Sequence, residues 1–166
     1  QMLDGVVRRY LHGPVYETLA ELDRATAPKY LLAPLLATGW VESADHLTLT
    51  LTLRDGVRFH NGEPFSSADV VAVFDTLMDP KLPTQTRRGY LVDLESYKAA
   101  GPFTVVFKWK RSLVSAARDL LTMVPMMPRS ALAGDFATAA VLRAPIGTGP
   151  FKFESWEPKK AITFRR

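Results

Sequence analysis

The sequence predicts a mixed α/β (α+β) body, and three patterns carry this expectation. Residues 47–53 read LTLTLTL, an alternation typical of a half-buried strand because successive side chains point to opposite faces. Residues 66–77 start with Ser66 and Asp69 in the spacing of a capping box and continue with apolar residues at helical spacing. Segments 151–155 and 161–164 flank Glu157 and Pro158 and predict a final hairpin. Strands of this kind beside a capped helix imply a layered body of sheet and helix.

The N-terminal third is less regular. Residues 3–19 place apolar side chains near helical spacing, although Gly13 and Pro14 interrupt the pattern, so we expect one helix or two short ones. The leucines around Pro34 predict a buried loop or a short helical turn. Trp40 and Val41 precede the alternating strand and predict a hairpin with it.

Four further elements follow in order. Asp55 and Gly56 form a turn pair, and residues 57–59 predict a short extended piece after it. Pro80 predicts the end of the helix that starts near Ser66. Residues 103–109, FTVVFKW, predict a strand because they are rich in β-branched and aromatic side chains. Ser112 can cap a helix that runs through Leu121.

Composition bounds the class of protein. A length of 166 residues is enough for one domain with a proper core. The chain has no cysteine, which excludes disulfides, thiolate zinc sites and cysteine nucleophiles. Lys and Arg number 21 against 17 Asp and Glu, a net charge of +4 that is spread along the chain and gives little support to nucleic-acid binding. No apolar stretch reaches the eighteen or so residues needed to span a bilayer.

The residues give no pattern of an enzyme, a cofactor site or a metal site. His12, His46 and His60 lack metal-ligand spacing, and we expect His60 to be a loop residue that bonds the backbone. Glu17 and Glu21 would stand one helical turn apart, which favours a solvated face over an acid–base pair. The run at 147–150, GTGP, lacks the Lys and Ser/Thr of a phosphate loop, so we expect a structural turn into the next strand.

Several segments together resemble a known family. Residues 54–74, RDGVRFHNGEPFSSADVVAVF, and residues 144–156, APIGTGPFKFESW, are similar to two characteristic blocks of the family 5 solute-binding proteins of ABC importers. This group includes peptide-, dipeptide- and nickel-binding proteins. Weaker similarity lies at 15–19, VYETL, and 34–40, PLLATGW. The blocks keep the family's order and spacing over nearly the whole chain.

The resemblance implies a periplasmic-binding-protein type II architecture, in which two lobes enclose a ligand and close by hinge motion. Full members are considerably longer, so we expect a fragment. Residues 1–18 would start lobe I, 19–125 would form an inserted subdomain, and 126–166 would return to lobe I. We expect the rest of lobe I and the opposing lobe to be absent, which predicts exposed apolar surface and weak or no ligand binding by this piece alone.

Site residues follow from the same resemblance. Relatives contact ligand with the segment before the VYE-like motif, which implies a substrate-binding role for Asp4, Gly5, Val6 and Arg9. An aromatic residue after the helix of the first block, which opens with Asp69 and Val70, also contributes, and Tyr90 matches that place. Asp4 could pair with a ligand amine, and Tyr90 could stack on a ligand side chain. Helix capping for Asp4 and core packing for Val6 remain equal alternatives. Relatives that bind metal chelates use an Arg before the block ending at Pro128, and TMVPMMP has none.

These features imply the substrate-binding component of an importer, located in the periplasm or outside the cell, with a lipid anchor as an open option. Its expected partners are a small-molecule or peptide ligand and the ABC permease membrane subunits, with no nucleic acid, no cofactor and no metal. We expect a monomer at full length. A ligand-sensing domain of a transcription regulator is the alternative, and upstream sequence would separate the two. An enzyme would need a nucleophile and base among groups such as Glu17, His60 or Asp69, and none converge in the sequence.

Overall fold

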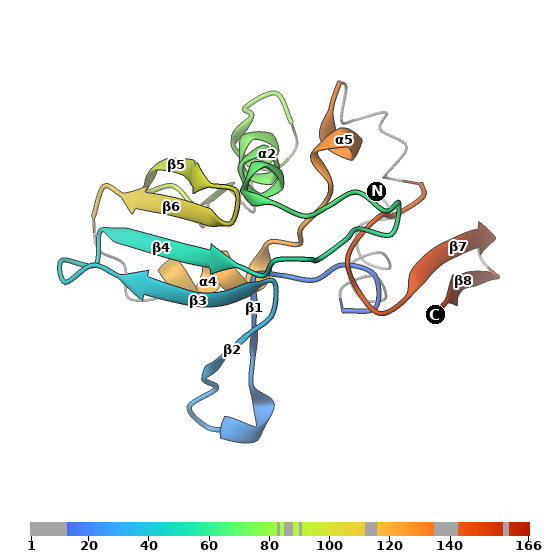
Figure 1. Ribbon diagram of the computed structural model, residues 1–166, viewed down its shortest axis with the longest axis horizontal. Coiled ribbons are helices and arrows are strands. Elements are labelled where there is room, and N and C mark those ends of the chain that lie inside the picture. The colour runs from blue at the N-terminus through green and yellow to red at the C-terminus, as the bar shows by residue number, and fades with distance from the viewer. Residues whose placement is uncertain are drawn as a thin grey trace.

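The protein folds into three antiparallel sheets and a few helices (Figure 1), seen in a computed structural model that describes residues 13–82, 84, 88–89, 91–111, 116–134, 143–157 and 160–166. The strands are β1 (Ala20–Leu22), β2 (Leu32–Pro34), β3 (Ala37–Glu42), β4 (Thr48–Leu53), β5 (Leu94–Gly101), β6 (Thr104–Trp109), β7 (Lys152–Glu157) and β8 (Ala161–Arg165). The helices are the 3-10 turn η1 (Arg24–Thr26), α2 (Ser67–Met78), α4 (Ala116–Met123) and α5 (Arg129–Leu132).

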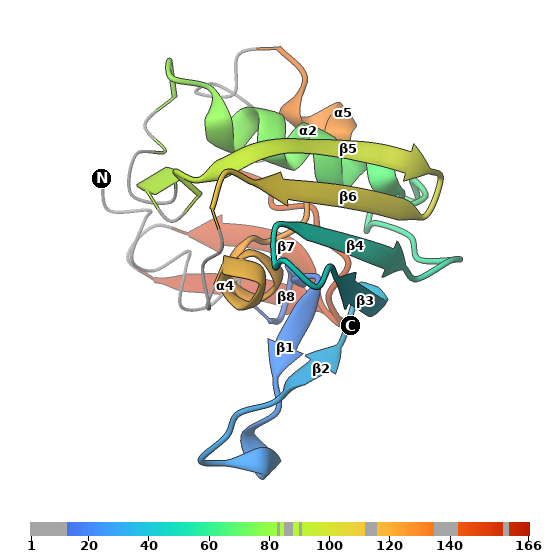
Figure 2. The ribbon, with the colours of Figure 1, turned by 90° about the vertical axis from the view of Figure 1, so that its left-hand side faces the viewer.

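A four-stranded sheet in the order β3-β4-β6-β5 forms the centre of the larger part, and Figure 2 shows the strands side by side. Leu51 pairs with Trp40 on one side and with Val105 on the other. Along β4 the leucines are at most 3% exposed, whereas Thr52 is exposed, as the alternating pattern predicts. The buried positions of neighbouring strands therefore share one face, and this face builds the core.

Helix α2 packs against that face. Its start is the predicted capping box, in which the main-chain N–H and the hydroxyl of Ser66 both donate to Oδ2 of Asp69, at 2.8 and 2.9 Å. Phe74 is fully buried, and its ring lies 4.9 Å from the ring of Phe107 on β6 and 5.5 Å from that of Tyr97 on β5. These contacts tie the helix to the two strands at one edge of the sheet.

The predictions for the final hairpin, the strand at 103–109, the β3–β4 hairpin and the turn at Asp55–Gly56 are confirmed. Two predictions for the N-terminal third are wrong where the structure describes the chain, and residues 3–12 of the first lie outside the described residues. Residues 13–19 form turns and extended chain instead of the end of a helix, because Gly13 takes a φ of +87° and Pro14 follows it. The segment around Pro34 is strand β2, and its Leu31 is 56% exposed.

Strands β1, β2 and β5 and helix α5 were not foreseen from the sequence. Strand β5 reads LESYKAAG and lies at an edge of the sheet, so only its first residue, Leu94, is buried and no alternation marks it. Strands β1 and β2 are three residues each and form a ribbon that projects from the body in both views (Figures 1 and 2). Ser112, the predicted helix cap, lies outside the described residues.

Buried side chains form two clusters, and the partly buried Met127 packs against both. The larger cluster unites the sheet with α2 and α4 and runs from Leu19 to Met126. The smaller cluster consists of Val15 and Tyr16, with Met127 and Phe164 packed against it. Phe164 belongs to β8, so the small cluster joins the chain near residue 15 to the final hairpin. In Figure 1 this hairpin lies on the opposite side of the molecule from the turn between β3 and β4.

Candidate functional site

The five predicted ligand-binding residues, Asp4, Gly5, Val6, Arg9 and Tyr90, all lie outside the described residues, so their roles stay predictions. The description of the chain begins at Gly13, a few residues after Arg9. Residues 13–16 are therefore the described residues that follow the predicted binding segment most closely in the sequence. Three segments that are distant in sequence meet there: residues 13–16, the loop around His60, and residues 147–151.

Residues 147–151 hold the first of these segments through its main chain. The Gly149 N–H donates to the carbonyl of Val15 at 2.9 Å, and the Phe151 N–H donates to the carbonyl of Pro14 at 2.9 Å. The predicted structural turn at GTGP is thereby confirmed as a turn that leads into β7. Its partner segment at 13–16 carries no pattern that could have identified it from the sequence.

The two glycines of this turn are required by the close approach. A Cβ atom at Gly147 would lie 2.0 Å from the carbonyl oxygen of Val15, and one at Gly149 would lie 2.6 Å from that of Pro14. Both contacts are with main-chain atoms, which cannot move aside as a flexible side chain can. We call Pro14, Val15, Gly147, Gly149 and His60 the joint.

Tyr16 lies beside the joint, where its ring carbon Cδ1 would be 3.0 Å from a Cβ atom at Gly147. The residue is 7% exposed, and burial raises the pKa of its phenol well above the ordinary value, with a hydrogen bond from the backbone at Ile146 opposing the shift. The phenol therefore stays neutral throughout the physiological range. This arrangement can fix the position of a chain segment, but it offers no group for covalent chemistry.

His60 reaches the joint from the other side. Its main-chain N–H donates to the carbonyl of Gly147 at 2.9 Å, and its ring Nε2 lies 2.8 Å from the carbonyl oxygen of Gly149. The prediction that His60 is a loop residue bonded to the backbone is confirmed. In the part of the chain that the structure describes, no group of three or more His, Asp or Glu side chains is arranged to hold a metal ion.

Other polar groups proposed from the sequence have structural roles. Glu17 and Glu21 are not one helical turn apart, because residues 17–19 are not helical and Glu21 lies exposed in β1. Asp69 is 3% exposed and uses both carboxylate oxygens, Oδ2 for Ser66 and Oδ1 for the main-chain N–H of Arg129 at 3.0 Å. The carboxylate thereby connects the start of α2 with the start of α5.

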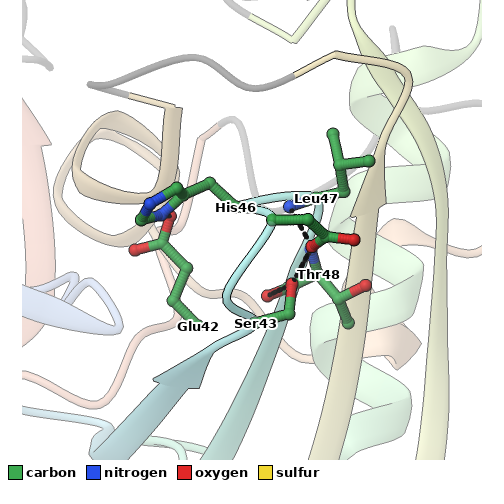
Figure 3. A network of polar contacts seen from close by, with 6 residues as sticks. Glu42, Ser43, His46, Leu47 and Thr48 are labelled. Atoms are coloured by element: carbon green, nitrogen blue, oxygen red, sulfur yellow. Dashed lines mark hydrogen bonds and ion pairs between the residues drawn. The ribbon is translucent and has the colours of Figure 1, made fainter.

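A dense polar network at the β3–β4 turn also proves to be structural (Figure 3). The Ser43 hydroxyl donates to Asp45 at 2.6 Å, and the Leu47 N–H donates to the same carboxylate oxygen at 3.0 Å. The hydrogen bond from Ser43, followed by that from Leu47, holds the pKa of Asp45 below its ordinary value. His46 pairs with Glu42 at 2.8 Å, but both side chains are exposed, so the network stabilises a turn whose His46 has a φ of +57°.

Comparison with known proteins places this geometry in a family. The model of the bacterial extracellular solute-binding proteins, family 5 (middle region), matches residues 32–166, more than three quarters of the chain. The chain belongs to this family. The resemblance noted in the sequence is confirmed, and the family is one of solute-binding proteins rather than enzymes. Among the described residues, no helix is long and apolar enough to cross a membrane.

Three proteins illustrate the match. Protein XP55 of Streptomyces lividans is 34% identical over 139 residues, which are 81% of this chain and 24% of that protein. The crystal structure of NikZ from Campylobacter jejuni in complex with Ni(L-His) superposes with a TM-score of 0.83 at 27% identity, covering 92% of this chain and 30% of NikZ. The periplasmic binding protein DppA from Helicobacter pylori, in complex with the peptide STSA, gives a TM-score of 0.79 at 26% identity, covering 92% of this chain and 33% of DppA.

The family 5 chain spans about a quarter of the length of the curated relatives it matches. Its mixed fold of strands and helices is therefore a part of the architecture of the solved structures. The two complexes above hold different ligands, a nickel chelate and a peptide, so membership of family 5 leaves the ligand open.

Proposed function

We propose that the full-length protein captures a short peptide, or a solute of similar size, in a cleft between two lobes and delivers it to the membrane permease of an ABC importer. The observation that carries this proposal is the match of the chain to family 5, together with the relative DppA, which is ABC transporter-associated and binds the peptide STSA. Capture would take place in the periplasm or outside the cell.

The two clusters of buried residues support the division into lobe and inserted subdomain. The buried residues of the larger cluster run from Leu19 to Met126, close to the proposed subdomain of residues 19–125, and Met127, Leu132 and Ile146 of the proposed first lobe pack against it. The smaller cluster combines residues 15–16 with β8, which supports a first lobe built from 1–18 and 126–166. In a two-lobed receptor, the ligand lies between lobes, and closure around it excludes water.

Within the first lobe, we assign ligand contacts to Asp4, Gly5, Val6, Arg9 and Tyr90. Asp4 would pair with the amino group of a peptide, and Tyr90 would pack on one of its side chains. Support for the first four comes from the resemblance of the neighbouring motif at 15–19 to the family. Pro14 and Val15, which follow Arg9 by five and six residues, are held by two main-chain hydrogen bonds.

A nickel chelate is the second candidate, favoured by the structural match to NikZ. The chain lacks the Arg that chelate-binding relatives are expected to carry before Pro128, and the side chain of Met126 in that stretch is fully buried in the larger cluster. The peptide is therefore the first choice. A ligand-sensing domain of a transcription regulator stays the alternative, and a helix-turn-helix region in the same polypeptide would identify it.

The decisive experiment is native mass spectrometry of the full-length protein with a mixed library of di- to pentapeptides and, separately, with Ni(L-His). Retention of peptides supports the proposal, and retention of only the chelate replaces it with the second candidate. The Asp4→Asn variant should lose about tenfold or more in peptide affinity, since a charged hydrogen bond is worth about 1.5–3 kcal/mol. The matched control Asp55→Asn, at an exposed turn, should bind as the wild type does.

A further inference from the structure

The ring of His60 is held in one tautomer by the joint. Nε2 lies 2.8 Å from the carbonyl oxygen of Gly149, and because a carbonyl only accepts, Nε2 must carry the proton. The Gly147 N–H points to Nδ1 over a longer distance of 3.4 Å, which requires Nδ1 to accept. Together the two contacts fit the tautomer that carries its proton on Nε2.

The loop that carries His60 is firmly attached to the larger cluster. Phe59 is 2% exposed and makes an edge-to-face contact with Phe65 at 5.8 Å between ring centres. The main chain closes the loop through a bridge between Arg58 and Pro64 and a hydrogen bond from the Gly62 N–H to the Phe59 carbonyl at 2.8 Å. A displacement of His60 would therefore have to distort the core beside α2.

The glycine turn at 147–149 connects His60 to residues 13–15 through hydrogen bonds. Gly149 accepts from His60 through its carbonyl and donates to Val15 through its N–H, so one residue bonds both segments. The missing Cβ atoms at Gly147 and Gly149 let the main chains approach closely enough for these bonds. His60 is 89 residues from Gly149 in the sequence. Its neighbour Phe59 belongs to the larger cluster, so His60 connects that cluster to the glycine turn.

We propose that His60 is a positioning residue for ligand binding: its ring fixes the Gly147–Gly149 turn, which in turn fixes Pro14 and Val15, five and six residues after the last of the proposed ligand-binding residues 4–9 in the sequence. This inference rests on the proposed function for its effect on ligand, but its structural part can be tested without a ligand. We therefore expect a substitution of His60 to lower the affinity for ligand, although His60 itself is not among the proposed ligand contacts.

The test compares three variants of the full-length protein. His60→Ala removes both ring contacts, and His60→Gln keeps an N–H donor near the position of Nε2. His46→Gln is the matched control, because His46 sits in an exposed turn and does not take part in the joint. Mass spectrometry measures the rate of hydrogen–deuterium exchange in peptide fragments that cover residues 146–151. Fragments that cover 49–53 and 104–109 serve for comparison.

For His60→Ala we expect exchange in 146–151 to accelerate by about five- to tenfold, the scale of one lost hydrogen bond, with little change in β4 and β6. The Gln variant should restore part of the protection and remains informative if the Ala variant fails to fold. Unchanged exchange in 146–151, or an equal acceleration in β4 and β6, would overturn the positioning role.

Affinity for the tightest peptide of the library is then measured by calorimetry. We expect a fall of about threefold or more for His60→Ala, partial recovery for His60→Gln and no change for His46→Gln. Loosened exchange with unchanged peptide affinity would overturn the link to the ligand. If the wild type retains no peptide, the proposed function fails, whereas the exchange data still decide whether His60 holds the joint.

Discussion

Two glycines show how single residues determine the joint. Gly147 and Gly149 are buried against main-chain oxygens of Pro14 and Val15, where no side chain fits. Glycine is needed here for space rather than for a left-handed backbone, since neither residue has a positive φ. The glycines of the GTGP run therefore serve close main-chain packing, and no phosphate-binding role is needed to account for them.

A methyl group at either glycine should therefore be costly. We expect Gly147→Ala and Gly149→Ala each to lower the free energy of unfolding by about 3 kcal/mol or more, because the main chains must separate. The control is Gly39→Ala, where a Cβ would meet nothing within 4 Å. Urea denaturation measures all three variants, and an equal effect at position 39 would show that the close approach is not the cause.

Asp69 is the second residue whose role rests on its surroundings. Its buried carboxylate accepts from the Ser66 main chain, the Ser66 hydroxyl and the Arg129 main chain. These bonds join the capping box of α2 to the start of α5, so the residue does more than cap one helix.

Removal of this carboxylate leaves buried donors without an acceptor. We expect Asp69→Ala to lower the free energy of unfolding by about 2–3 kcal/mol. Asp55→Ala, which removes an exposed carboxylate bonded only within its own turn, should cost less than about 1 kcal/mol. Thermal denaturation of both variants checks the difference, and equal shifts in Tm would contradict a special role for Asp69.

At the scale of elements, helix α2 and strands β5 and β6 are joined through aromatic rings. Phe74, Tyr97 and Phe107 form a continuous group, and the Tyr97 hydroxyl also donates to Asp75 of α2 at 2.8 Å. This group connects the helix to β5, whose own sequence pattern is too polar to predict its pairing. The edge strand is thus held by packing and by the ladder to β6.

Substitution of two phenylalanines compares the stabilisation from a buried ring with that from a partly exposed one. Phe74→Ala should lower the free energy of unfolding by about 3–5 kcal/mol, because it empties a fully buried site. Phe151→Ala, at a residue that is 40% exposed, should cost less than about 1.5 kcal/mol. Paired urea titrations give both values, and similar losses would mean that α2 is not central to the core.

The final hairpin has one apolar face because of a bulge. Phe153 pairs with Phe164 and Trp156 pairs with Ile162, and the register shifts between Phe153 and Ser155. The extra residue brings Trp156 to the same face as Phe153, although they are three positions apart. Phe164 packs against the small cluster, whereas Trp156 at the far end of this face is 38% exposed.

At the scale of the whole molecule, two tyrosines make stability depend on alkaline pH. Burial raises the pKa of Tyr16, and burial followed by the hydrogen bond and charge of Asp75 raises the pKa of Tyr97. In the unfolded chain both phenols lose their protons near the ordinary pKa of about 10. Above that pH the unfolded state binds fewer protons than the folded state, so stability must fall as pH rises.

We expect the contribution of these two phenols to the free energy of unfolding to be constant below about pH 9 and to decrease from about pH 10 upward. Tyr97→Phe should make the decrease shallower, because one of the two raised phenols is gone. Urea denaturation of both proteins between pH 8 and 11 measures the slopes. Parallel slopes would contradict the contribution of Tyr97.

Local sequence patterns determined the regular elements of this protein. The leucine–threonine alternation of β4, the capping pair of α2 and the β-branched run of β6 each predict their structure, because these signals lie within one element. The motifs at 54–74 and 144–156 identified the family. The same patterns misread 13–19 and the segment around Pro34, where glycine and proline interrupt the apolar spacing.

Only the tertiary structure decided the joint and the edges. That Gly149 meets both His60 and Val15 depends on contacts between segments up to about 130 residues apart, and no local pattern encodes such a meeting. Strand β5 and the ribbon of β1 and β2 exist because neighbouring strands supply their hydrogen-bond partners, so propensity alone could not locate them. The sequence by itself thus determined the family and the main strands and helix, whereas long-range packing decided how the segment after the predicted binding residues is held.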